Sequence, residues 1–225
     1  MSKARTWLKG LIGGAILVLM PPLLAGHWDL PTVWALIGVY IGFLLAAWFT
    51  IFRKDPDLLR ERQQSGPGAK RWDRIWLTIY SMFLLSALVV AILDVGRFHW
   101  SDTMPIWLQV AGFVGFAASL IFAAWAMAEN TFFSEVVRIQ HDRGHRVVAT
   151  GPYRYVRHPG YLGNIIAWPC TALAIGSWLA LLPAAVVVVL YVIRTALEDR
   201  TLQAELAGYV EYAQQVRYRL VPGIW

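Results

Sequence analysis

The sequence predicts an all-α integral membrane protein of about six transmembrane helices, with a small cytoplasmic hairpin and a C-terminal amphipathic helix. Of its 225 residues, 58% are hydrophobic and only 15% are charged, against roughly 45–50% and about 25% in soluble domains. The mean hydropathy is +0.51. Apolar runs of about 20 residues recur along the chain, which is the helix length needed to cross the hydrocarbon core.

Six apolar runs mark the predicted spans, at residues 8–26, 31–52, 75–94, 105–127, 160–178 and 179–197. The linker 53–74 combines charge with a Ser-Gly-Pro-Gly turn, whereas 128–158 is rich in Arg and His. The first run, with basic residues before it, also resembles a secretory signal peptide, and its removal would leave the sidedness of the other spans unchanged. Two pairs of glycines in the first two spans have the spacing typical of close helix packing: Gly10 with Gly14, and Gly38 with Gly42.

The placement of Lys and Arg tests this map independently. Residues 1–10 hold three, 53–74 seven, 128–158 five and 194–225 four, which is nineteen of the twenty. With six spans, all four segments fall on one side of the membrane, and the positive-inside rule makes that side cytoplasmic. Both termini are therefore predicted to be cytoplasmic, and a bacterial inner membrane is the predicted location.

Composition also argues against several functions. The predicted spans carry no Asp, Glu, Lys, Arg or His over 31–52, 75–93, 105–127 and 160–193, whereas pumps and ion-coupled transporters place such groups at mid-membrane. The net charge of +6 is attributed to the cytoplasmic flanks of the spans, so nucleic acid is not an expected partner. Cys170 is the single cysteine, and no cluster suggests a metal site. Polar chemistry is expected at the cytoplasmic boundary.

The densest polar and aromatic cluster lies at residues 151–161, just before the fifth predicted span. A proline suits the first turn of a helix, so this span is predicted to begin at Pro159, with His158 immediately before it. A helix N-terminus offers free N–H groups to an anion, and Arg154 and Arg157 would strengthen that preference. The alternative is structural, because Arg and Tyr are ordinary anchors at the membrane interface.

The lengths of the last two spans predict which residues meet at this boundary. About 20 residues separate Pro159 from Trp178, and about 20 more lead to Glu198, so each arm measures roughly 30 Å at 1.5 Å per residue. The chain returns to the level where it started, and Glu198 and Asp199 should lie beside the start of the fifth span. The alternative is that Glu198 pairs with Arg194 at i, i+4.

Two further elements are predicted around this boundary. Residues 136–140 and 145–148 flank an Asp142-Arg143-Gly144 turn and predict a short β-hairpin over the site. After the last span, apolar residues spaced by 4, 3, 4 and 3 predict one face of an amphipathic helix, which could fold back as a lid. These residues are Leu202, Leu206, Tyr209, Ala213 and Val216.

Residues 151–163 resemble the Arg-His-Pro-x-Tyr-x-Gly motif of the isoprenylcysteine carboxyl methyltransferase family, whose general plan the phospholipid methyltransferases share. The family's second motif is an acidic pair after the last apolar helix, then a tyrosine-containing tail and a late proline. It appears here as Glu198-Asp199, Tyr209, Tyr212 and Pro222. The pair is normally Glu-Glu, so Asp199 departs from the pattern. The resemblance covers about residues 125–225.

The resemblance implies methyl transfer from S-adenosylmethionine (SAM) to a lipophilic or lipid-anchored acceptor that arrives from the bilayer. It implies Arg157 and Glu198 as catalytic residues. Arg157, His158 and the helix start are expected to take the SAM carboxylate, Glu198 its ammonium group, and tyrosines its adenine or sulfonium. The full set of implied cofactor-binding residues is Arg157, His158, Pro159, Tyr161, Gly163, Glu198, Asp199, Tyr209 and Tyr212.

The predicted organisation has two parts: four N-terminal helices in 1–127, including the loop 53–74, and a cofactor-binding region in 128–225. Two other functions stay open, a reductase of the sterol reductase type that uses NADPH and a non-catalytic membrane protein of the same fold. No obvious extra basic site for a 2′-phosphate is present. The acceptor also stays open among a prenylated protein, a phospholipid amine, a small thiol and a secondary metabolite.

Overall fold

The computed structural model describes residues 3–63 and 68–225, and within these ranges every regular element is a helix. Most of the predicted Ser-Gly-Pro-Gly turn lies outside the described residues. The elements in chain order are α1 (Lys3–Ala25), α2 (Pro31–Ala47), the π-helix η1 (Trp48–Phe52), α3 (Pro56–Gln63), α4 (Arg71–Leu93), the π-helix η2 (Asp94–Phe98), α5 (Ile106–Glu129), the 3₁₀-helices η3 (His141–Arg143) and η4 (Gly151–Arg154), α6 (Pro159–Ile175), α7 (Leu181–Glu205) and α8 (Tyr209–Gln215).

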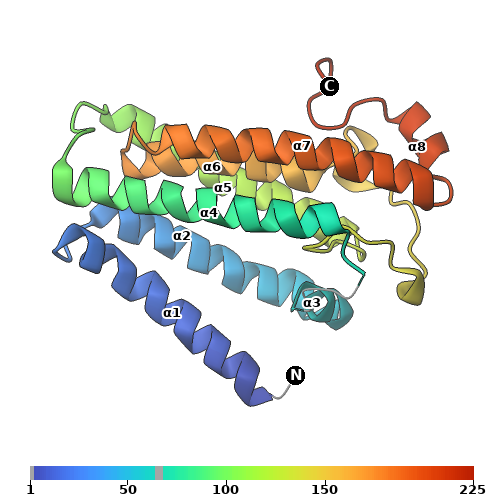
Figure 1. Cartoon of the computed structure of the whole chain (residues 1–225), viewed down its shortest axis with the longest axis horizontal. Helices are drawn as coiled ribbons and strands as arrows, with labels where there is room; N and C mark the ends of the chain where they lie inside the picture. The colour runs from blue at the N-terminus through green and yellow to red at the C-terminus, as the bar shows by residue number, and fades with distance from the viewer. Residues whose placement is uncertain (1–2, 64–67) are drawn as a thin grey trace.

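Six long helices occupy the six predicted apolar runs and alternate in direction, with α3, α8 and the irregular segment 130–158 gathered at one end (Figure 1). We call this end of the bundle the α8 end. Among the described residues, four segments are long and apolar enough to cross a membrane: Pro31–Phe52, Arg71–Phe98, Ile106–Glu129 and Leu181–Glu205. The apolar part of α1, Gly10–Ala25, is shorter, and α6 has 17 residues. The all-helical class is confirmed and the apolar helices support a membrane protein, whereas the number of six spans stays a prediction.

The closest helix contact is between α5 and α6, because glycines let the two backbones approach. A Cβ atom on Gly112 would lie 2.5 Å from the backbone nitrogen of Ala174 and 2.9 Å from the carbonyl oxygen of Cys170. The glycine pairs singled out in the first two spans behave differently, since a Cβ on any of the four would meet no described atom within 4 Å. Close packing therefore uses a helix pair that the glycine spacing did not indicate.

A buried carboxylate joins the loops at the opposite end of the bundle. Asp94 is fully buried, and its Oδ2 accepts hydrogen bonds from the hydroxyls of Ser101 and Ser177, each at 2.5 Å. Those hydroxyls in turn accept from the backbone N–H groups of Trp178 and Ala180, at 2.9 and 3.0 Å. The turn between α6 and α7 is thereby anchored to the end of α4, which holds the α6–α7 hairpin in place.

The predicted β-hairpin over the site is wrong, although its turn is in the right place. Residues 141–143 form η3, and Gly144 follows with φ +63°. No strand pairs the flanking segments within the described residues. The N–H of Val137 instead donates to the buried carboxylate of Asp73 at 2.7 Å, and the side chain of Gln140 donates to the carbonyl of Phe132 at 2.7 Å. These tertiary partners replace the ladder that the alternating pattern predicted.

The predicted C-terminal amphipathic helix is broken in two. Helix α7 continues to Glu205, and α8 begins at Tyr209 after Gly208, whose φ of +79° ends the helical path. The apolar residues of the predicted face nevertheless share one cluster with two residues of the 136–148 segment. That cluster comprises Ile139, Val147, Leu202, Leu206, Tyr209, Tyr212, Ala213 and Val216.

Candidate functional site

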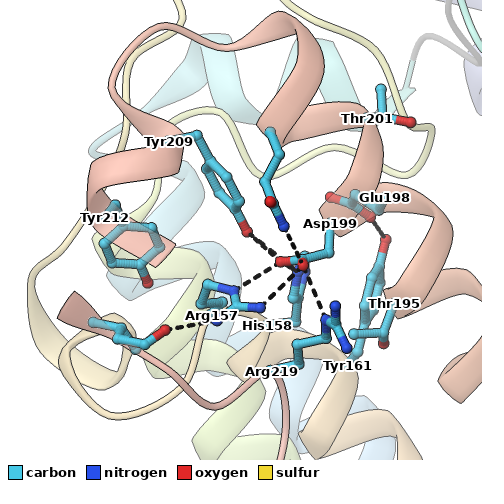
Figure 2. Close-up of polar contacts among 12 residues, drawn as sticks. Arg157, His158, Tyr161, Thr195, Glu198, Asp199, Thr201, Tyr209, Tyr212 and Arg219 are labelled. Carbon is cyan, nitrogen blue, oxygen red and sulfur yellow. Dashed lines mark hydrogen bonds and ion pairs between the residues drawn. The ribbon is translucent and has the colours of Figure 1, made fainter. Parts of the chain in front are cut away.

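The carboxylate of Asp199 is the centre of the polar network at the α8 end (Figure 2). It lies fully buried on α7 and accepts hydrogen bonds from Arg157 Nε at 2.8 Å and Nη2 at 3.0 Å. Arg157 Nη1 donates to the carbonyls of Val216 and Arg217, at 2.7 and 2.8 Å. Arg157 therefore joins the start of α6 to α7 and to the C-terminal tail, as the hairpin geometry predicted for Asp199.

Four more side chains complete the shell of Asp199. Arg219 Nε and Gln203 Nε2 donate to Oδ2 at 2.9 and 2.8 Å, and His158 Nε2 lies 3.2 Å from Oδ1. The hydroxyl of Tyr209 donates to Oδ1 at 3.0 Å. Burial, followed by the nearby Asp199 charge, raises the pKa of Tyr209 far above its ordinary value, so the phenol stays protonated and keeps donating.

The C-terminal tail is hydrogen-bonded to the backbone just before α6. The N–H groups of Arg157 and His158 donate to the carbonyls of Tyr218 and Arg219, both at 2.9 Å. Helix α6 begins at Pro159, as predicted, with the proline in its first turn. The two backbone N–H groups that precede α6 are thus bonded to the chain's own tail.

Glu198 faces a different direction from its neighbour Asp199. It lines a cavity, and the hydroxyl of Tyr161 donates to its Oε2 (Figure 2). The Tyr161 ring lies parallel to the His158 ring with centroids 5.8 Å apart. The alternative partner, Arg194, forms its ion pair elsewhere. The acidic pair therefore divides into a structural centre, Asp199, and a cavity-lining carboxylate, Glu198.

Arg194 lines the same cavity and was missed as a site residue. Its Nε lies 3.0 Å from Asp73 Oδ1, and its Nη2 donates to the carbonyl of Glu135 at 2.6 Å. The guanidinium also covers the rings of Trp76 and Tyr161, with distances of 4.3 and 5.3 Å to the centroids. A usable signal was present in the sequence, because Arg194 lies inside a predicted span, where a charged side chain usually faces the protein interior.

The cavity measures about 740 Å³ and has two chemically different parts. Its polar part, at the α8 end, is bounded by side chains of the Asp199 region and by residues of the 130–148 segment. Its apolar part runs along one face of α4, from Leu77 to Leu88, and also contacts α2, α5 and α6. The eleven residue steps from Leu77 to Leu88 correspond to roughly 16 Å of helix. The apolar lining includes Leu36, Ile37, Leu84, Phe116, Leu120 and Ala167.

Six of the nine predicted cofactor-binding residues line this cavity: Arg157, His158, Tyr161, Glu198, Tyr209 and Tyr212. Tyr212 also donates to the carbonyl of Tyr153 at 2.7 Å. The other three lie behind its wall. Pro159 starts α6, and Asp199 is enclosed by its partners. Gly163 faces α5, where a Cβ atom would lie 3.0 Å from Ala123 Cβ and 3.1 Å from the Ser119 carbonyl.

Residues 107–207 match the family model described as phospholipid methyltransferase. The match runs from the start of α5 to just beyond α7, so it contains the Arg157–Asp199 pair, Glu198 and Arg194. The resemblance of the C-terminal region to integral membrane methyltransferases is thereby confirmed. The more specific likeness to isoprenylcysteine carboxyl methyltransferases stays a prediction, as does the division at residue 127. No curated protein matches the chain.

Proposed function

We propose that this protein transfers the methyl group of SAM to a lipophilic acceptor at the cytoplasmic face of the membrane. The observation that carries the proposal is the two-part cavity, in which Glu198 and Tyr161 adjoin an apolar arm between membrane helices. The matched phospholipid methyltransferase family supports methyl transfer to a membrane substrate. A polar cofactor from the aqueous side and an apolar acceptor from the bilayer would meet at this junction.

The polar part of the cavity suits a zwitterionic cofactor. The Glu198 carboxylate fits the ammonium group of SAM, because Tyr161 occupies only one of its two oxygens. The rings of Tyr161, Tyr209 and Tyr212 line the same space, and an aromatic face attracts a cation by about 0.5–2 kcal/mol. SAM supplies a methyl group activated by its positive sulfur, and the protein aligns that group with the acceptor.

The contacts of Arg157 and Arg194 indicate different roles for the two side chains. Arg157 uses its Nε, Nη1 and Nη2 groups on Asp199 and on the tail carbonyls. We therefore assign Arg157 a positioning role in place of the direct catalytic role that the resemblance implies. Arg194 lies one helical turn inside Glu198 on α7 and lines the cavity. In this proposal Arg194 orients an anionic group of the acceptor.

Calorimetric binding of S-adenosylhomocysteine to the detergent-purified protein tests the cofactor. Glu198→Gln is expected to weaken binding roughly 10- to 150-fold, the value of one lost charge-assisted hydrogen bond. Its melting temperature should stay near that of the wild type, because Glu198 contacts only Tyr161 among the described hydrogen bonds. Arg200→Gln, an exposed change two residues away, serves as the matched control. Binding of NADPH in place of S-adenosylhomocysteine would favour the reductase and overturn the proposal.

A further inference from the structure

Helices α2 and α4 separate from each other toward the α8 end of the bundle (Figure 1). At the opposite end, Val33 and Leu36 of α2 share one apolar cluster with Ala91 and Ile92 of α4. Nearer the α8 end the two helices pack on different neighbours. There Ala47 of α2 belongs to a cluster with α3 and α5, whereas α4 packs with α6 and α7. The cavity lies where the two helices diverge, because both of them line it.

The cavity reaches the outer surface of the bundle between these two helices. Its lining includes Tyr40 of α2 and Ser81 of α4, and both residues are exposed. Leu36 and Phe116 also line the cavity, but they are buried and face it from inside the bundle. A cavity with buried walls and exposed residues at one edge is open at that edge. We call the opening between Tyr40 and Ser81 the α2–α4 portal.

The α2–α4 portal lies within the apolar length of both helices. Tyr40 follows Pro31 by nine residues and precedes Phe52 by twelve, so it lies roughly 14 and 18 Å from the two ends of that segment. Ser81 follows Arg71 by ten residues, which is roughly 15 Å of helix. The hydrocarbon core of a bilayer is about 30 Å thick. The portal therefore faces lipid chains and not water.

The portal is connected to the proposed reaction site through the apolar part of the cavity. Tyr80, beside Ser81, packs edge-to-face on Tyr191 of α7 with ring centroids 5.4 Å apart. Tyr191 precedes Glu198 by seven residues, so the portal lies roughly 10 Å deeper in the bundle than Glu198. In the other direction the cavity continues along α4 to Leu88. A chain that enters here has apolar space along α4 and the polar part of the cavity at one end.

Building on the proposed function, we infer that the α2–α4 portal is the entrance through which the acceptor passes from the bilayer into the cavity. The acceptor is then a molecule with a long hydrocarbon chain, and a small water-soluble thiol is not the substrate. The hydroxyl of Ser81 already donates to the Leu77 carbonyl at 2.7 Å, so the portal offers it to no polar ligand. The side chains around the portal are mainly aliphatic, namely Leu36, Ile37, Leu77, Leu84 and Leu88.

Photolabelling in vesicles tests this entrance. The full chain is reconstituted in phosphatidylcholine vesicles that contain a long-chain fatty alcohol with a diazirine at mid-chain, and it is irradiated without SAM. Peptide mass spectrometry then maps the adducts. We expect adducts on the buried cavity residues Leu36 and Phe116 as well as on the exposed Ile121 of α5. Labelling of Ile121 without Leu36 and Phe116 overturns the inference, including the case in which a second copy of the chain covers the portal.

Ser81→Trp places a large side chain in the portal and should abolish the adducts on Leu36 and Phe116 while the surface adducts stay. Met82→Trp is the matched control, because Met82 is the adjacent exposed residue on α4 and lies outside the cavity. Its adducts should equal those of the wild type. Interior labelling that persists in folded Ser81→Trp shows a different entrance and overturns the inference.

Tyr40→Ala tests the same portal from its other edge and with the opposite sign. Removal of the ring widens the opening, so the interior adducts should increase relative to the surface adducts. Ile41→Ala is its matched control, because Ile41 is the adjacent exposed residue on α2 and lies outside the cavity. If Ser81→Trp does not fold, Tyr40→Ala decides, and interior labelling equal to that of Ile41→Ala overturns the inference.

Binding of S-adenosylhomocysteine to the same preparations separates this inference from the proposed function. Ser81→Trp should bind it with the affinity of the wild type, since the portal lies roughly 10 Å from the polar site. A wild type that binds S-adenosylhomocysteine but is not labelled inside overturns the portal and leaves the methyltransferase proposal standing. A wild type that is labelled inside but does not bind S-adenosylhomocysteine overturns the methyltransferase proposal, and the entrance for a lipophilic molecule stands.

Discussion

The Arg157 guanidinium donates hydrogen bonds to both carboxylate oxygens of Asp199, from Nε at 2.8 Å and from Nη2 at 3.0 Å. The two residues lie 42 positions apart in the sequence. Both side chains are buried, and the same guanidinium holds two carbonyls of the tail. The pair therefore ties α6, α7 and the C-terminal tail into one unit beside the cavity. Its carboxylate is the residue that departs from the usual Glu-Glu pair of the resembling family.

We expect Asp199→Asn to lower the free energy of unfolding by about 3–5 kcal/mol, because it leaves the buried Arg157 without its counter-charge. Thermal unfolding of the purified protein in detergent measures this loss. Asp199→Glu keeps the charge, so its melting temperature should lie between that of Asp199→Asn and that of the wild type. Arg200→Gln, on the neighbouring exposed position, should leave the melting temperature unchanged. An unchanged melting temperature for Asp199→Asn would show that the ion pair does not hold the unit together.

Asp73 and Arg194 should behave as a coupled pair. Each is buried, and each single change, Asp73→Asn or Arg194→Gln, leaves a charge without its partner. The double variant should be less destabilised than the sum of the two singles, with a coupling of about 0.5–3 kcal/mol. A double-mutant cycle in melting temperature and denaturant midpoint measures it. Additive effects would contradict a direct interaction.

Gly112→Ala should destabilise the α5–α6 contact. The new methyl group would meet backbone atoms of α6 at 2.5 and 2.9 Å, and backbone cannot move aside as a side chain can. Overpacking of this kind costs about 1–3 kcal/mol. Gly38→Ala is the matched control in another apolar helix, because its methyl group meets no described atom within 4 Å. Equal melting temperatures for the two variants would contradict the close approach of α5 and α6.

His145 should make stability depend on pH in acid. Burial, followed by the charges of Arg138 and Arg143, lowers the pKa of His145 from 6.5 to about 4. The unfolded chain binds this proton below about pH 6.5 and the folded chain only near pH 4, so stability falls as the pH drops across that window. Above that window the group contributes no pH dependence.

His145→Asn should flatten the fall in melting temperature between pH 6.5 and 4.5. The exposed His141→Asn serves as the control and should keep the slope of the wild type. Below pH 4.5 both variants should still lose stability through Glu61, whose hydrogen bond from Arg138 lowers its pKa. A wild-type slope in His145→Asn would show that another group titrates in the window.

Much of the site could be placed from local sequence. The preference of proline for the first turn of a helix located the start of α6. The equal lengths of the last two helical arms predicted that Asp199 lies near Arg157. The same reasoning could not assign the two acidic residues their separate duties. Adjacent positions on a helix point about 100° apart, so the choice between cavity and interior depends on what packs against each face.

Hydropathy and charge are properties of each segment alone, and they determined the membrane class, the position of the long helices and the boundary where polar groups gather. Only the tertiary structure decided the break before α8, the absence of a hairpin in the described residues, the partner of Arg194 and the two-part cavity. Arg194 and Asp73 lie 121 residues apart. Such contacts leave no periodic signal along the chain, because they depend on which helix faces meet after the bundle has formed.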